Sequence, residues 1–206
     1  MGLFDMFRKK AEPALLLDEK KLQEVARYRS REQQLFKDLQ AKALGKVDTY
    51  IEGKVYCKLQ DAEIEVDLYD DVPLDYAEKC ALAMNAMPEE LIDAICIAAR
   101  RYCLEYLDAV GGAEMNGIEL RVPVNEDTPP REMLKCFDIG LLCVPVPQDP
   151  TRVGYQLSGD CDWEEEHGIE IVILDDQLVY LGEFSGVSPW EDHSEESWNA
   201  AAKHGQ

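Results

Sequence analysis

Residues 62–68 alternate strictly between apolar and acidic side chains, and this pattern constrains the fold more than any other feature of the sequence. The apolar positions are Ala62, Ile64, Val66 and Leu68, and the acids between them are Glu63, Glu65 and Asp67. A period of two residues places the apolar side chains on one face of an extended strand and the acids on the other. The segment is therefore predicted to be a strand with one face on a hydrophobic core and an acidic face toward solvent.

The same period recurs along the chain, so the strand is expected to belong to a sheet. Further strands are predicted over residues 54–59, 118–124, 139–146, 155–163, 169–174 and 178–181. Turns around Gln60 and at residues 175–177 join neighbouring strands as hairpins. In the first hairpin, Lys54 and Lys58 are expected beside the acids of residues 62–68, because opposite charges across strands stabilise the pair.

Two helices are predicted between residues 74 and 110, opened by Pro73 and Pro88 and closed near Asn85 and at Gly111. The regular apolar stripe of the second helix is Leu91, Ile95, Ala99, Tyr102 and Tyr106. Such a stripe indicates a helix face buried in a core. We therefore predict an α+β fold, an antiparallel sheet of about six strands packed on one face by two helices and preceded by a basic N-terminal helical arm.

The charge distribution divides the chain into three predicted parts. Residues 1–46 hold 11 bases and 7 acids (11 − 7 = +4), whereas residues 47–206 hold 10 bases and 35 acids (10 − 35 = −25). The basic arm, residues 1–46, is expected to form a helix from Asp18 through Leu44, with Gly45 as its stop. Residues 47–186 form the α+β domain, and residues 187–206 form an acidic polar tail in which Ser194 caps a short helix with Trp198 on its inner side.

The net charge of −21 argues against nucleic acid as a partner, because phosphates must be neutralised by lysine and arginine. It favours a basic partner or a cation. No apolar run approaches the roughly 20 residues of a membrane span, so no integral membrane segment is expected, and no signal peptide is visible. The seven cysteines are odd in number and lack paired spacing, which predicts a reduced, cytoplasmic protein.

The stretch from Tyr155 to Phe184 combines a strand, an acidic run and a hairpin. Its central residues are Cys161, Trp163, Glu164, Glu165, Glu166, His167 and Gly168, and its return strand holds Leu178, Tyr180, Leu181 and Gly182. This pattern resembles a group of uncharacterised bacterial domains of unknown function, over roughly residues 47–184. Glu170 stands where that group has a second glycine, and Asp176-Gln177 replaces its Asp-Gly turn. The resemblance implies likeness to immunity proteins and other partner-binding proteins of bacterial conflict systems.

Three interpretations of the acidic residues stay open. As a partner-binding face, the candidates are Asp61, Glu63, Glu65, Asp67, Asp160, Asp162, Glu164 and Glu166. As a divalent-metal site, they are Asp162, Glu164, Glu166 and His167. Carboxylates two apart on a strand lie about 6.6–6.8 Å apart, so one ion would need further ligands. In the structural interpretation, His167 bonds a carboxylate or a backbone carbonyl and Trp163 anchors the sheet.

The leading functional hypothesis is a bacterial, non-enzymatic protein-binding module of the immunity type, which uses an acidic face and needs no cofactor. One alternative is a divalent-metal-dependent hydrolase centred on Glu164, Glu166 and His167. A Cys161–His167 dyad is not favoured, because six residues of extended strand span about 20 Å. Another alternative is a self-associating structural protein, in which the basic arm of one subunit crosses the acidic body of another.

Overall fold

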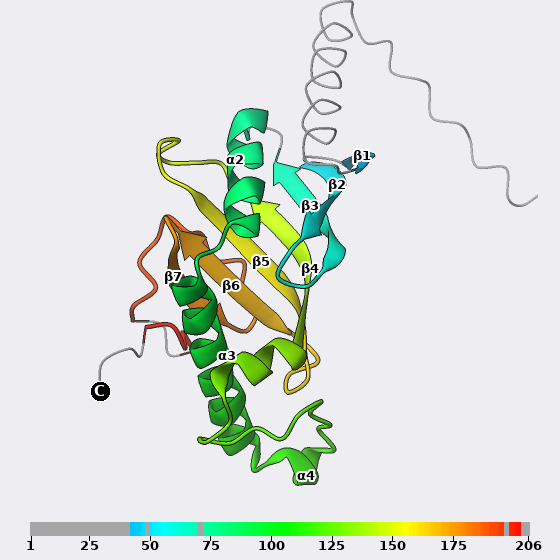
Figure 1. Ribbon diagram of the computed structural model, residues 1–206, viewed down its shortest axis with the longest axis vertical. Coiled ribbons are helices and arrows are strands. Elements are labelled where there is room, and N and C mark those ends of the chain that lie inside the picture. Colours follow the sequence, from blue (N-terminus) through cyan, green and yellow to red (C-terminus); the bar gives the residue numbers. More distant parts are fainter. Residues whose placement is uncertain (1–41, 48–49, 70–71, 196–197, 203–206) are drawn as a thin grey trace, which may run out of the picture.

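The computed structural model describes residues 42–47, 50–69, 72–195 and 198–202 (Figure 1). Seven strands form one sheet in sequential order. They are β1 (Lys42–Val47), β2 (Tyr50–Cys57), β3 (Ala62–Tyr69), β4 (Phe137–Val144), β5 (Gly154–Cys161), β6 (Ile169–Leu174) and β7 (Gln177–Gly182). Five of the neighbouring pairs are antiparallel, and β3 and β4 run parallel.

The parallel pair corrects the prediction of a purely antiparallel sheet. The connection between β3 and β4 carries α2 (Leu74–Asn85), α3 (Glu89–Val110), α4 (Ala113–Asn116) and the short 3-10 helix η1 (Pro130–Lys135). A crossover of this length brings the chain back to the end of the sheet at which β3 began, so β4 starts in the same direction as β3. Strand alternation alone carries no information on the direction in which two strands pair.

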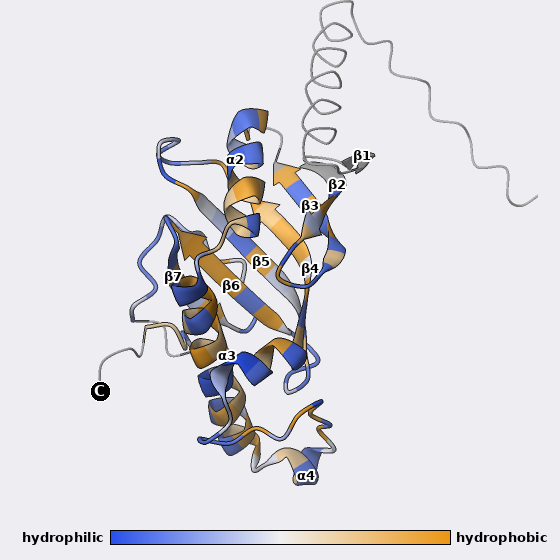
Figure 2. Ribbon diagram, in the orientation of Figure 1, coloured by the Kyte–Doolittle hydropathy of each residue, from blue (hydrophilic) through white to orange (hydrophobic). Residues whose placement is uncertain are grey.

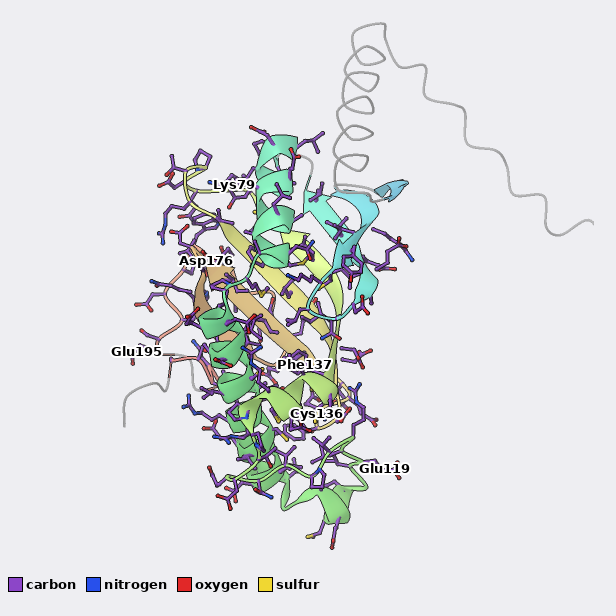
Figure 3. The ribbon with its side chains drawn as sticks, viewed as in Figure 1. Lys79, Glu119, Cys136, Phe137, Asp176 and Glu195 are labelled. Carbon is purple, nitrogen blue, oxygen red and sulfur yellow. The ribbon has the colours of Figure 1, made fainter. Side chains whose placement is uncertain are left out.

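The two long helices lie against one face of the sheet, as predicted (Figure 1). The hydroxyl of Tyr76 on α2 accepts from the backbone N–H of Gly154 on β5 at 2.9 Å. In Figure 3, Lys79 on α2 lies beside the β4–β5 loop, where its ammonium donates to the carbonyl of Thr151 at 2.8 Å. The second helix, α3, contacts η1 and the edge strand β7, so it lies over the β7 side of the sheet.

The hydrophobic core lies between this face of the sheet and the helices. On β3 the buried side chains are Ile64, Val66 and Leu68, and on α3 they include Leu91, Ile95, Ala99 and Tyr102. Figure 2 shows hydrophobic residues along the central strands behind the helices. The apolar side chains of residues 64–68 and the stripe of α3 thus point into one core, because each pattern keeps its apolar side chains on a single face, whereas Ala62 at the start of β3 is exposed.

The opposite face of the sheet is covered over β5–β7 by residues 185–195 and 198–202, which we call the C-terminal segment. Val172 and Glu170 of β6 point away from the helices, yet they are 0% and 1% exposed. The segment does not contain the predicted short helix within residues 187–195 and 198–202, and Trp198 is 43% exposed rather than inward. Trp190, in contrast, packs against the core. Contacts with the sheet, rather than helical hydrogen bonds, therefore order this segment.

Two further predicted elements differ in the structure. Residues 118–124 form no strand, although Ile118, Leu120, Val122 and Val124 do pack against the core. An extended chain buries alternate side chains whether or not its backbone pairs with a strand, so the period revealed the buried face and not the pairing. Lys42, Ala43 and Leu44 belong to β1 instead of the expected helix, and Gly45 lies within this strand. The rest of the predicted basic arm lies outside the described residues.

The cysteines all carry free thiols, and six of them are buried. The six buried cysteines behave as small apolar side chains of the core. Among the described residues, no helix combines the length and the apolar character that a membrane crossing requires.

Candidate functional site

The turn that follows β5 is closed by Glu164. Its carboxylate accepts hydrogen bonds from the backbone N–H groups of Glu166 at 3.0 Å and His167 at 2.6 Å. The side chain satisfies two main-chain donors that the turn leaves without backbone partners, as a capping residue does at a helix start. Glu164 is 4% exposed, so it does not belong to the predicted acidic surface. The strand β5 ends at Cys161. The alternation that places every second side chain on the outer face of the sheet therefore stops before residue 164.

Trp163 fastens this turn to α3. The indole is buried and meets the ring of Tyr102 edge to face, with 5.5 Å between the ring centroids. The Tyr102 hydroxyl donates to the carbonyl of Gly168 at 3.3 Å. Burial raises the pKa of Tyr102 well above its ordinary value. The geometry matches the structural interpretation of Trp163, since an edge-to-face pair of this kind contributes about 0.5–1.5 kcal/mol beyond its buried area.

Gly168 is required by the backbone of the same turn. Its φ of +65° lies in the left-handed region, and a Cβ atom there would lie 2.2 Å from the carbonyl oxygen of Gly159. A Cβ on Gly159 would in turn lie 1.9 Å from the carbonyl oxygen of Asp138. Three backbone segments thus approach one another more closely than any side chain permits.

His167 lies at the surface of the turn. Its imidazole is 53% exposed, and its Nδ1 lies 3.5 Å from an oxygen of Glu164. The predicted histidine–carboxylate neighbour is present, but the distance exceeds that of a good hydrogen bond. The firm contacts of Glu164 are with the backbone of the turn, and the imidazole adds little to them.

Asp162 is held by Arg121, a residue for which the sequence suggested no role beyond a strand position. The backbone N–H of Arg121 donates to one oxygen of Asp162 at 2.8 Å, and its Nε donates to the other at 2.7 Å. Its Nη1 reaches Asp138 on β4 at 2.7 Å. Asp138 stands opposite Asp160 in the β4–β5 register, so the guanidinium offsets like charges on adjacent strands. The cluster joins residues far apart in the sequence.

The predicted metal residues do not converge on one point. Asp162 is engaged by Arg121, Glu164 is turned into its own loop, and only Glu166 and His167 project outward. Among the described residues, no group of three or more histidine, cysteine, aspartate or glutamate side chains has the arrangement of a metal site. Burial raises the pKa of Cys161 to about 12, so its thiol is not prepared to act as a nucleophile.

The acidic residues of β3 do share a surface with acids from neighbouring strands. Glu63 and Glu65 are exposed and Asp67 is half-buried, while Asp138 on β4 and Asp160 on β5 are exposed. All five side chains point away from the helices, and we call them together the acidic face. Asp61 lies beside it in the β2–β3 turn, where its carboxylate accepts from the Tyr56 hydroxyl. Asp138 was missed because the predicted strand began at Ile139.

Apolar and basic side chains border the acidic face. Leu141 and Cys143 of β4 stand beside Glu65 and Asp67 in the parallel register, and both are half-buried. On β2, Lys54 stands opposite Glu65 and the exposed Tyr56 stands opposite Glu63. The lysine position agrees with the predicted cross-strand pairing of charges. The surface is therefore a mixture of carboxylates around half-exposed apolar groups.

Comparison with known proteins gives one family. A family model described as a domain of unknown function (DUF6985) matches residues 35–188. Neither the curated proteins nor the solved structures contain a significant match to the chain. The matched range includes the whole seven-stranded sheet, its helices and the turn at Glu164.

Proposed function

We propose that this chain, which belongs to the DUF6985 family of domains of unknown function, is a non-enzymatic protein-binding module that engages a basic protein through the acidic face. The observation that carries the proposal is the gathering of carboxylates from β3, β4 and β5 on the sheet face that the helices do not cover. The same face is buried over β6, where the C-terminal segment lies. Within the part of the chain that the structure describes, the acidic half of this face is thus the accessible half.

The composition of this surface suits a protein partner. Carboxylates at its rim attract a basic surface over long range and raise the association rate. Half-exposed Leu141, Cys143 and Tyr56 offer apolar area that a partner would bury, and apolar groups surrounded by polar ones are typical of protein interfaces. A toxin of a bacterial conflict system is the partner class that the resemblance to immunity proteins supports.

A pull-down from native lysate at low salt, with the full chain as bait, tests the proposal. Wild type is expected to recover a basic protein that is released as salt is raised, because screening weakens the attraction. The double variant Glu65→Gln/Asp160→Asn is expected to recover at least about tenfold less, which corresponds to about 1.4 kcal/mol.

The matched control is Glu90→Gln/Asp108→Asn, which removes the same two charges from exposed positions on α3. This control should recover as much partner as wild type. Recovery of no basic protein by wild type, or equal loss in both double variants, would show that the acidic face is not the binding surface.

A further inference from the structure

Gly140 lies within β4 at a position where the described part of the chain gives no reason for a glycine. Its φ is negative, and a Cβ atom built on it would meet no atom of the described residues within 4 Å. Every other glycine between residues 111 and 186 has either a positive φ or an atom within 3.0 Å of such a Cβ. A glycine inside a strand weakens it, because the backbone loses more freedom on folding and no side chain packs on the sheet. Gly140 therefore lowers stability without a compensating contact among these residues.

The β-bulge at this position explains an additional residue and does not explain a glycine. The β4–β5 register shifts between Ile139 and Leu141, so Gly140 has no residue directly opposite it on β5. The kind of bulge that requires glycine places it in the left-handed region. The negative φ of Gly140 excludes that kind. Gly140 is exposed, so the missing side chain is a property of the outer surface of the sheet.

Carboxylates of the acidic face surround the space above Gly140. The strand β4 lies between β3 and β5 (Figure 1). Glu65 on β3 pairs with Leu141, the residue after Gly140, and Asp160 on β5 pairs with Asp138, two residues before it. Neighbouring strands are about 4.8 Å apart and two residues of a strand span about 6.6–6.8 Å. All three carboxylates can therefore reach a group that lies on Gly140.

Arg121 shows how a guanidinium binds to these carboxylates. Its Nη1 donates to Asp138 and its Nε donates to Asp162, each at 2.7 Å, so one planar group joins two acids. A lysine ammonium presents its donors from a single, more strongly hydrated point. The ion pairs among the described residues do not include Glu65 or Asp160. These two carboxylates are thus available to a second guanidinium.

We propose, on the basis of the binding function given above, that the basic partner lays one arginine side chain over Gly140 and places its guanidinium between Glu65 and Asp160. The aliphatic part of that arginine lies on the β4 backbone at Gly140 and on the half-buried Leu141. Only a glycine leaves the backbone open to such a contact. Gly140 is therefore the residue that determines the specificity of the acidic face for arginine.

The glycine weakens the free protein and strengthens the complex, and this opposition separates its role from a structural one. Gly140→Ala is expected to raise the urea concentration at which half of the full-length chain is unfolded, because alanine restricts the unfolded backbone and tolerates the negative φ. The same variant should recover less basic protein than wild type in the pull-down. A glycine that the fold required would give a lower urea midpoint.

The direct test uses N-acetyl-arginine amide as the probe. It is titrated at low salt into isotope-labelled full-length protein, and the backbone N–H signals of Gly140 and Leu141 are followed by NMR. Wild type should give saturable shifts, and N-acetyl-lysine amide should bind more weakly. Gly140→Leu should bind the arginine probe at least about tenfold more weakly, because its side chain fills the space of the arginine stem. The matched control, Ala109→Leu, adds the same side chain at an exposed position on α3 and should bind as wild type does.

The pull-down from native lysate distinguishes this proposal from the binding function itself. Gly140→Leu and Glu65→Gln/Asp160→Asn are both expected to lose the basic protein. If Gly140→Leu recovers as much as wild type while the charge variant does not, the acidic face binds its partner without an arginine at Gly140, and only the arginine contact is refuted. Recovery of no basic protein by wild type would refute both. No saturable shifts with the arginine probe, equal binding of the lysine probe, or a lower urea midpoint for Gly140→Ala would each overturn the role of Gly140.

Discussion

At the scale of single residues, Glu170 shows how burial decides the chemistry of a carboxyl group. It stands in a strand pattern in which alternate residues were expected at the surface, and it is almost fully buried. Burial raises its pKa above the ordinary value of 4.5. Between the ordinary and the raised pKa, the folded protein holds the proton more firmly than the unfolded chain. The contribution of Glu170 to the free energy of unfolding therefore falls as the pH rises through this window.

The variant Glu170→Gln removes this titration and leaves an oxygen that accepts hydrogen bonds. The free energy of unfolding of the variant, minus that of wild type, is expected to increase as the pH rises through the window and to level off above it. Urea unfolding at a series of pH values measures the difference. Glu165→Gln removes one charge from an exposed position and supplies the control for net charge. A difference that is constant, or that falls with rising pH, would contradict the role assigned to burial.

At the scale of elements, the turn between β5 and β6 depends on one glycine. Gly168→Ala is expected to lower the free energy of unfolding by roughly 3 kcal/mol or more, because strain at positive φ is combined with a backbone clash. Gly117→Ala is the matched control, since Gly117 has a φ of +67° and has no atom within 4 Å of an added Cβ. The control should lose about 1–2 kcal/mol. Similar losses in the two variants, measured by urea unfolding, would show that the close approach to Gly159 is unimportant.

The elements also show which parts of the fold local patterns can predict. The helices α2 and α3 and the strands β2 to β7 agree with predicted segments to within a few residues, because each carries a clear period and clear end signals. Residues 118–124 carry the same period but make a different backbone contact. The N–H of Arg121 bonds the carboxylate of Asp162 instead of a strand. That bond joins residues 41 positions apart, which a local pattern does not register.

At the scale of the whole molecule, the net charge of −21 has a consequence for stability. Like charges repel one another more strongly in the compact state than in the expanded chain. Raising NaCl from about 20 mM to about 300 mM is therefore expected to raise Tm in differential scanning calorimetry, because the screening length becomes shorter than about 10 Å. Glu65→Gln/Asp160→Asn should reduce the salt dependence more than Glu90→Gln/Asp108→Asn, since the acidic face concentrates charge. A Tm that falls as salt is added would exclude self-repulsion as the dominant electrostatic effect.

The candidate site was predictable only in part. The acids of β3 and Asp160 were correctly placed on an outward surface, because strand alternation determines the face on which a side chain lies. Glu164 was wrongly placed there, because the strand ends before it and its carboxylate turns toward backbone N–H groups. Asp138 and Arg121 were missed, and nothing in their local sequence marks them as neighbours of Asp162.

The sequence by itself determined the α+β class, the two core helices and most strands of this protein. These properties follow from hydrophobic periods within short windows, where burial of one face is the dominant driving force. The tertiary structure alone decided the parallel pairing of β3 with β4, the burial of Glu170 and the packing of the C-terminal segment on β5–β7. Each of these depends on hydrogen-bond partners supplied by segments that are separate in the chain. The same carboxylate is a solvated surface charge or a buried acceptor according to whether such a segment reaches it.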